Sequence, residues 1–352
     1  MFEQKIISTG NNYPAINFND KQYEAICIYP QNRKPLKELA AIEGVALEEI
    51  YTQINELLHE GLVDQIAKDI YLPNFPVIAV SDANKYFKVQ DSVVSQTISK
   101  IEKLLSQVKD KCMEIRGLSM FPFESISLLI LSNVLLDNFQ IRNVEKMVLQ
   151  ADRPSRSGKN YYFSLQEKGD NQSEAFGIYG NMYLEYGSRL FAIYGNNRNK
   201  PNFLNISDEK LKQLFPLQTK SEIPKETLLI WLEDAAKSES NLEPAQLECL
   251  ASLGLLNTGL LDVPILTMQD VNKLYDIAAI FTTELVTILN NHKSILINNY
   301  ENSPYVQSVT FEEYFIWWYH LYYTKVTDSL IARGLIIIPE CGNFQYIVTN
   351  DK

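Results

Sequence analysis

The N-terminal fold is decided by residues 36–63, which read LKELAAIEGVALEEIYTQINELLHEGLV. The apolar residues of 36–42 recur at helical spacing until Gly44, so we predict a short helix that ends there. A longer apolar stripe predicts a second helix over 47–59, and Gly61 is suited to be its C-terminal cap. The segment therefore encodes two helices joined by a tight turn.

Extended segments are expected on both sides of these helices. After them, Asp69–Pro73 has the pattern of a short strand. Before them, residues 14–29 carry β-branched and aromatic residues around Asn19-Asp20, which is a turn signal. We therefore predict a hairpin over 14–29, with Tyr23–Tyr29 as its second strand.

The order of helix, tight turn, longer helix and strand resembles winged-helix modules. With the extended segment in front, residues 14–73 also resemble the PqqD-like peptide-recognition domains of ribosomal-peptide modification systems. That resemblance implies a leader peptide that adds a strand to the N-terminal sheet and packs on a helix. We therefore expect an extended peptide to pair with 23–29 and to touch the helix over 47–59. The expected peptide-binding side chains are Ile26, Ile28, Tyr51 and Ile54.

The charge of this module separates peptide binding from DNA binding. The whole chain has a formal net charge of −11, and residues 33–73 contain four basic and eight acidic residues. The helix over 47–59 has no Lys or Arg, although phosphate contacts and guanine recognition depend on such cations. A winged-helix transcription regulator is therefore an alternative that needs DNA contacts from elsewhere, and nucleic acid is not the partner we expect. A module that only packs internally is the third alternative.

A different pattern occupies residues 160–195 and predicts a central antiparallel meander. Gly180-Asn181 and Gly187-Ser188 suit two-residue hairpin turns, because glycine accepts the positive φ that such turns require. Tyr161–Leu165 is expected as a further strand of the same sheet.

The other segments are mostly helical. Apolar spacing predicts long helices over about 84–113 and 124–149, the second with a break near Asn138. Thr310 and Glu313 have capping-box spacing and are expected to open the last helix, which a hairpin over 335–348 follows. We thus predict an α+β, mostly helical fold in three domains. The first domain, 1–80, is a winged-helix-like module with preceding strands. The second, 81–205, holds long helices and the antiparallel meander. The third, 206–352, is a helical domain with a C-terminal winged-helix-like hairpin.

Two further segments are candidate binding surfaces. Arg153, Arg156 and Lys159 concentrate positive charge in a loop, which we expect either to bind an acidic partner or to be merely solvated. The run 311–323 is rich in aromatic residues on more than one helix face. Such a helix is either buried in the core, which we favour, or part of a partner interface.

The sequence offers little catalytic or metal-binding chemistry. Its three histidines have no second histidine at metal-ligand spacing, and its four cysteines form no CxxC pair. The segment Ser157–Asn160 lacks the upstream glycine of a phosphate loop and the hydroxyl that binds magnesium there. We expect no cofactor and no metal, and a protein that is not catalytic on its own. An enzyme without a linear motif remains an alternative.

We find no targeting signal in the sequence, and we expect a cytoplasmic protein. We find no signal peptide after Met1, and the most apolar run, 126–136, is too short to span a bilayer. The function expected from all these features is recognition of a peptide or protein partner. By resemblance, the protein would be the precursor-peptide-binding partner of a separate modifying enzyme.

Overall fold

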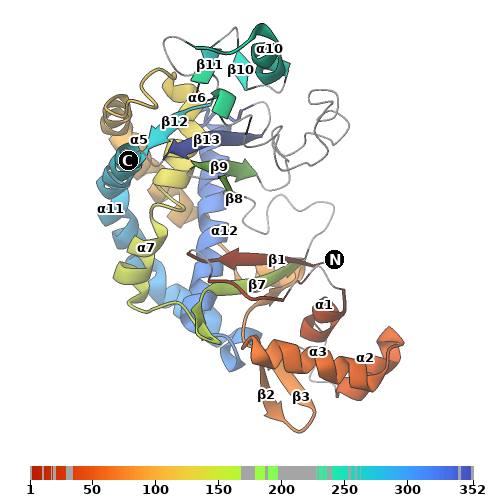
Figure 1. The fold of residues 1–352 in the computed structure, drawn as a ribbon. Helices are drawn as coiled ribbons and strands as arrows, with labels where there is room; N and C mark the ends of the chain where they lie inside the picture. Colours follow the sequence, from red (N-terminus) through yellow and green to blue (C-terminus); the bar gives the residue numbers. More distant parts are fainter. Residues whose placement is uncertain are drawn as a thin grey trace. The chain divides into compact units, whose positions relative to one another are not determined.

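The fold is α+β, with many helices and several small sheets (Figure 1). The computed structural model describes residues 2–9, 12–16, 18, 21–28, 35–167, 179–186, 189–196, 227, 230–232, 234–235, 240–252, 255–257, 260–261, 263–339 and 342–349.

The chain divides into two compact units, each made of three separate segments. Unit 1 comprises 1–96, 142–177 and 285–325, and unit 2 comprises 97–141, 178–284 and 326–352. Three consecutive domains were expected from the sequence. The two units instead interleave along the chain, because the two long helices α11 (Met268–Glu301) and α12 (Phe311–Ala332) each begin in one unit and end in the other.

Unit 1 begins with β1 (Phe2–Ile7) and continues with α1 (Lys21–Ile28), α2 (Leu36–Glu43) and α3 (Leu47–His59). The strands β2 (Val63–Ala67) and β3 (Ile70–Pro73) then pair antiparallel. The predicted helices over 36–43 and 47–59 are confirmed. Gly44 ends α2 at φ +68°, and its N–H donates to the carbonyl of Ala40, because a left-handed residue can close the last helical turn in this way.

The predicted hairpin over residues 14–29 is wrong, because α1 occupies Lys21–Ile28. Ile26 and Cys27 are fully buried in the module core, and Tyr23 packs against the same core. The spacing of these three residues matches one face of a helix, so helix formation buries side chains that an alternating strand would have divided between two faces. The N-terminal strand of the module is instead β1, which precedes residue 14 and was not predicted.

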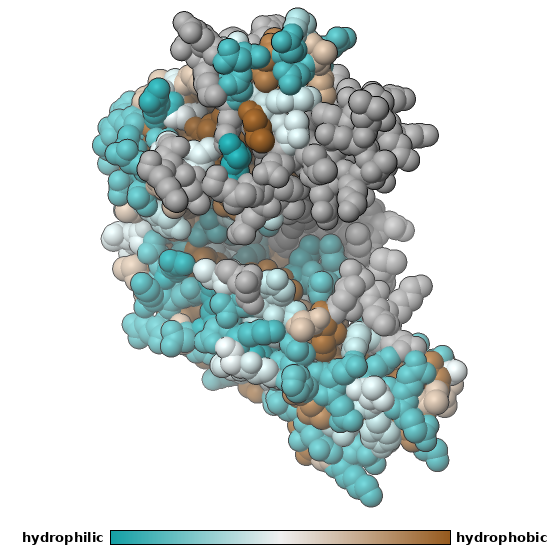
Figure 2. All heavy atoms as spheres, in the orientation of Figure 1, coloured by the Kyte–Doolittle hydropathy of each residue, from teal (hydrophilic) through white to brown (hydrophobic). Residues whose placement is uncertain are grey.

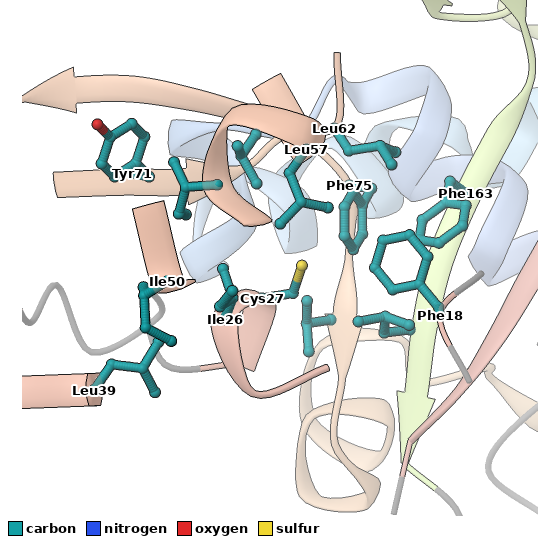
Figure 3. Packing of buried hydrophobic residues seen from close by; sticks show 14 of the residues in the cluster. Phe18, Ile26, Cys27, Leu39, Ile50, Leu57, Leu62, Tyr71, Phe75 and Phe163 are labelled. Atoms are coloured by element: carbon teal, nitrogen blue, oxygen red, sulfur yellow. The ribbon is translucent and has the colours of Figure 1, made fainter. Parts of the chain in front are cut away.

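A three-stranded sheet joins distant parts of unit 1. The strand β7 (Tyr162–Glu167) lies between β1, which is antiparallel to it, and the short β4 (Val77–Ile78), which is parallel. Phe163 of β7 packs on Phe75 and Phe18, with ring centroids 4.6 Å and 4.8 Å apart (Figure 3). The N-terminal helices and β7 therefore share one hydrophobic core.

Unit 2 contains a four-stranded sheet in the order β12-β13-β9-β8. The strands β8 (Tyr179–Tyr186) and β9 (Arg189–Asn196) pair antiparallel. The turn predicted at Gly187-Ser188 lies outside the described residues. The turn predicted at Gly180-Asn181 is wrong, since both residues lie inside β8. Tyr161–Leu165 was also misplaced, because most of it belongs to β7 in the other unit.

The C-terminal hairpin is also a wrong prediction. The strand β13 (Asn343–Thr349) exists, but residues 335–338 form no strand. Instead β13 pairs antiparallel with β9 and parallel with β12 (Ile265–Thr267). The partners of β13 come from other parts of the chain, and local composition could not reveal them.

Each of the two long helices predicted over 84–113 and 124–149 is divided into shorter elements in the structure. The first is α4 (Val80–Tyr86) followed by α5 (Asp91–Met113). The second is α6 (Phe123–Leu128), the π-helix η2 (Leu129–Val134), a break over 135–140 that confirms the one expected near Asn138, then α7 (Ile141–Val144) and the π-helix η3 (Glu145–Leu149). The structure also describes several shorter elements. They are β5 (Ser155–Arg156), β6 (Lys159–Asn160), α10 (Pro244–Ser252), β10 (Leu256–Asn257), β11 (Leu260–Leu261) and η4 (Pro304–Gln307).

The aromatic run of α12 belongs to the core, as favoured from the sequence. Its fully buried members include Tyr314, Trp318, Tyr319, Tyr322 and Tyr323. Thr310 opens the helix as expected, since its Oγ1 accepts a hydrogen bond from the N–H of Glu313. Among the residues that the structure describes, no helix is long and apolar enough to cross a membrane.

Candidate functional site: a groove beside α3

A groove of about 720 Å³ lies in unit 1 beside the second half of α3. One wall is formed by Ala15 and Ile16 together with Tyr23 of α1, and the other by α3 itself. The groove is open to solvent rather than enclosed. Its described lining residues are Ala15, Ile16, Tyr23, Thr52, Asn55, Glu56, His59 and Glu60.

The amphipathic pattern of α3 explains why this wall is polar. Ile50, Ile54 and Leu57 point into the module core, where each is at most 1% exposed (Figure 3 labels Ile50 and Leu57). The residues on the opposite face are therefore directed to solvent, at three- and four-residue spacing. Those that line the groove are Thr52, Asn55, Glu56 and His59, all exposed.

Two carboxylates dominate the charge of the groove. The hydroxyl of Tyr23, a neutral group, donates to Glu56. Within the described part of the chain, no Lys or Arg forms an ion pair with Glu56. Glu60 accepts a hydrogen bond from the N–H of Ala15 at 3.0 Å, and Lys159 Nζ lies 3.8 Å from its carboxylate. Among the described residues, Glu60 is thus partly neutralised by a cation, and Glu56 is not.

The four side chains expected to bind peptide do not line this groove. Ile26 and Ile54 are fully buried in the module core. Ile28 and Tyr51 are half-buried and pack against the same core, and the hydroxyl of Tyr51 donates to Asp69 at 2.8 Å. These residues hold the module together, because their apolar atoms are already occupied by core contacts.

Arg156 of the predicted basic loop is a buried structural residue. The loop is a hairpin of β5 and β6, with Ser157 and Gly158 at φ +48° and +80° in its turn. Arg156 is 3% exposed, and its Nη2 donates to Glu313 Oε2 at 2.5 Å and to the carbonyl of Asn74 at 2.9 Å. A guanidinium that is satisfied in this way cannot also bind a partner.

The other two cations of the loop are also engaged. Arg153 Nε donates to Glu145 at 2.7 Å, and both side chains are largely buried. Lys159 is about one-third exposed and approaches Glu60. The three residues therefore do not form one solvent-facing basic patch.

The described residues contain little that could perform chemistry. They include no group of three or more His, Cys, Asp or Glu side chains that could hold a metal ion. Cys27, Cys112 and Cys249 are buried free thiols, and burial raises the pKa of Cys112 to about 12, so this thiol is not reactive. Desolvation lowers the pKa of His292 and that of His320. The pKa of His320 falls to about 4, although the hydrogen bond that its Nδ1–H donates to the carbonyl of Ile316 opposes this shift.

Apolar side chains on the described surface are dispersed. Ile42 of α2 and Ile66 of β2 are 63% and 48% exposed, and Figure 2 shows small separate apolar groups on a mainly hydrophilic face. Single exposed apolar residues are normal on protein surfaces. The groove beside α3 is accordingly the stronger candidate for a binding site.

Tyr23, Glu56 and Glu60 are groove residues that the sequence analysis did not single out. Tyr23 was assigned to a strand, and the carboxylates were considered only as an obstacle to DNA. The exposed stripe of α3 was visible in the sequence at helical spacing, but the opposite wall depends on how residues 15–23 fold back. Comparison with protein-family models, curated proteins and solved structures finds no match to this chain.

Proposed function

We propose that this protein is a binding protein, which recognises an extended segment of a peptide or protein partner in the groove beside α3. The observation that carries the proposal is the groove itself. Its volume of about 720 Å³ lies within the range that ligand sites occupy, and its lining mixes apolar and polar groups, as binding sites do. The rigid core beneath α3 would hold this wall in place while the ligand binds.

The arrangement of α2, α3 and the β2–β3 hairpin supports a winged-helix-like module. In such a module α3 has the position of the recognition helix. Its exposed residues include Glu48, Glu49 and Glu56, and the helix contains no Lys or Arg. Three carboxylates would repel the phosphate backbone, so a peptide or protein suits this surface better than DNA.

The mode of binding differs from the one expected by resemblance. Residues 21–28 form a helix, so they offer no strand edge to which a peptide could be added. We propose instead that the peptide binds in the groove beside α3. The resemblance of residues 14–73 to PqqD-like domains adds one specific candidate for the ligand, the precursor peptide of a separate modifying enzyme.

A peptide selection with a steric block tests the proposal. Random 12-residue peptides displayed on phage would be selected against the full chain, and the enriched clones would be rescreened on Asn55→Trp. Asn55 is exposed and lines the groove, so the indole would fill space that a ligand needs. We expect the enriched clones to lose binding to this variant.

The matched control is Gln107→Trp, which places the same ring on an exposed position of α5 that is not among the described lining residues of the groove. Clones should bind this variant as they bind the wild type. Enriched clones that bind Asn55→Trp undiminished, or a selection that enriches nothing, would contradict the proposal.

A further inference from the structure

We infer that the groove selects a ligand segment with a positively charged side chain, Lys or Arg, which ion-pairs with Glu56. The inference rests on the proposed function and makes it more specific. It depends on three features of the groove: the state of its carboxylates, the apolar surface beside them, and the cations that surround them.

The charge of Glu56 is the first feature, because no described Lys or Arg pairs with it. The contact that the structure gives its carboxylate is the hydroxyl of Tyr23, which is a neutral donor. The side chain is exposed, so a cation can reach it without the cost of burying a carboxylate. A ligand ammonium or guanidinium would complete a charge-assisted hydrogen bond there.

The apolar surface of the opposite wall is the second feature. Ala15, Ile16 and the ring of Tyr23 line the groove next to the carboxylates. Lys and Arg combine a long aliphatic stem with a charged end, so the stem can cover apolar surface while the end remains at the carboxylate. A guanidinium can in addition stack on a tyrosine ring. An Asp or Glu side chain would meet like charge at the same place.

The third feature is the distribution of cations around the groove. Among the described residues, Lys159 is the one Lys or Arg with an ion pair to a groove carboxylate, and this pair is to Glu60. Arg156 and Arg153 lie in the same hairpin region, but Glu313 and Glu145 hold them. The described cations therefore satisfy Glu60 in part, and none of them pairs with Glu56, which is the carboxylate that we assign to the ligand.

The test is the frequency of Lys and Arg among peptides selected from a random 12-residue phage library. Three full-length proteins are compared: the wild type, Glu56→Gln and Glu43→Gln. The last removes the same charge at an exposed position of α2 outside the groove. We expect Lys and Arg to be enriched on the wild type and on Glu43→Gln, and to return to the library frequency on Glu56→Gln.

Synthetic copies of enriched peptides then give the magnitude. Exposed ion pairs are weak, so Glu56→Gln should weaken binding about two- to fivefold and reduce its dependence on salt. Peptides that lose binding to Asn55→Trp but show no enrichment of Lys or Arg would overturn this inference and leave the proposed function standing. If no selected peptide responds to Asn55→Trp, the proposed function itself fails.

Discussion

Arg156 and Glu313 form an ion pair with a distance of 2.5 Å between Nη2 and Oε2, although 157 residues of sequence separate them. Both side chains are buried. The second oxygen of Glu313 accepts the N–H of Phe163 at 2.8 Å, and Arg156 also donates to the carbonyl of Tyr161 at 2.9 Å. With Asn74 as a further acceptor of Arg156, the pair connects β7, the start of α12 and the segment after β3 within unit 1.

Replacing Arg156 by Ala should destabilise the protein strongly. The change would leave the Glu313 carboxylate buried without its cation, and removing one partner of a buried ion pair typically costs about 3–5 kcal/mol. Urea denaturation followed by circular dichroism measures the loss. A triple replacement of Arg153, Arg156 and Lys159 would therefore destabilise the fold and could not serve as a test of partner binding alone.

Lys159→Ala serves as the control for this prediction, because the side chain is partly exposed and its pair with Glu60 is long. An exposed pair contributes about 0–1 kcal/mol, so the variant should unfold close to the wild-type midpoint. Equal losses for Arg156→Ala and Lys159→Ala would show that the buried pair has no special role.

Acidification should destabilise unit 1 through His320. Burial lowers the pKa of this side chain to about 4, below its ordinary value of 6.5, so the unfolded chain binds the proton more readily than the folded one. Stability should therefore fall as the pH drops from about 6.5 to about 4. The rings of Trp317 and Tyr323 pack against the imidazole, with centroids 5.5 Å and 5.0 Å away.

The measurement is the free energy of unfolding of the wild type and of His320→Gln at pH 7.0, 5.5 and 4.5. Because Gln does not titrate, the free energy of unfolding should fall less for His320→Gln than for the wild type as the pH is lowered. The change can be at most about 1.4 kcal/mol per pH unit for one proton. A difference that stays constant with pH would show that His320 does not contribute.

Gly117→Ala should destabilise unit 2 by steric conflict. A Cβ at this position would lie 2.3 Å from the carbonyl oxygen of Ile265 and 2.7 Å from Leu266 Cδ2, and backbone cannot move aside cheaply. We expect a loss of about 1–3 kcal/mol, as is typical of overpacking. The measurement is thermal unfolding, with Gly158→Asn as the control. At Gly158 no atom lies within 4 Å of the added Cβ, and Asn tolerates the positive φ. If Gly117→Ala unfolds at the same midpoint temperature as the wild type, this packing is contradicted.

The parts of the fold that the sequence predicted are those governed by local spacing. The helices α2 and α3 follow from apolar residues three and four positions apart and from Gly44, all within one short segment. The helix α1 was missed because Ala25, Ile26, Cys27 and Ile28 have strand-like composition, while the core that selects a helix also contains Phe163, far away in sequence. Strand partners such as β1 with β7, or β13 with β9, are non-local and have no local signal.

The candidate site was predicted only in part, for a similar reason. The acidic, cation-free face of α3 could be read from the sequence, and so could its unsuitability for DNA. The groove needs a second wall, and Ala15 and Tyr23 come to α3 through the packing of Phe18 and Ile26 in the module core. Likewise, the sequence showed that Arg156 is charged, but not that Glu313 lies beside it.

Hydrogen exchange of the full chain with and without a selected peptide tests the central claim most directly. The peptide would be one that binds the wild type and fails to bind Asn55→Trp. The account predicts new protection of backbone amides in two segments, residues 15–28 and 47–60, with little change in the sheet formed by β8, β9, β12 and β13. Protection in that sheet or in the C-terminal part of α12, with the amides of α1 and α3 unchanged, would contradict it.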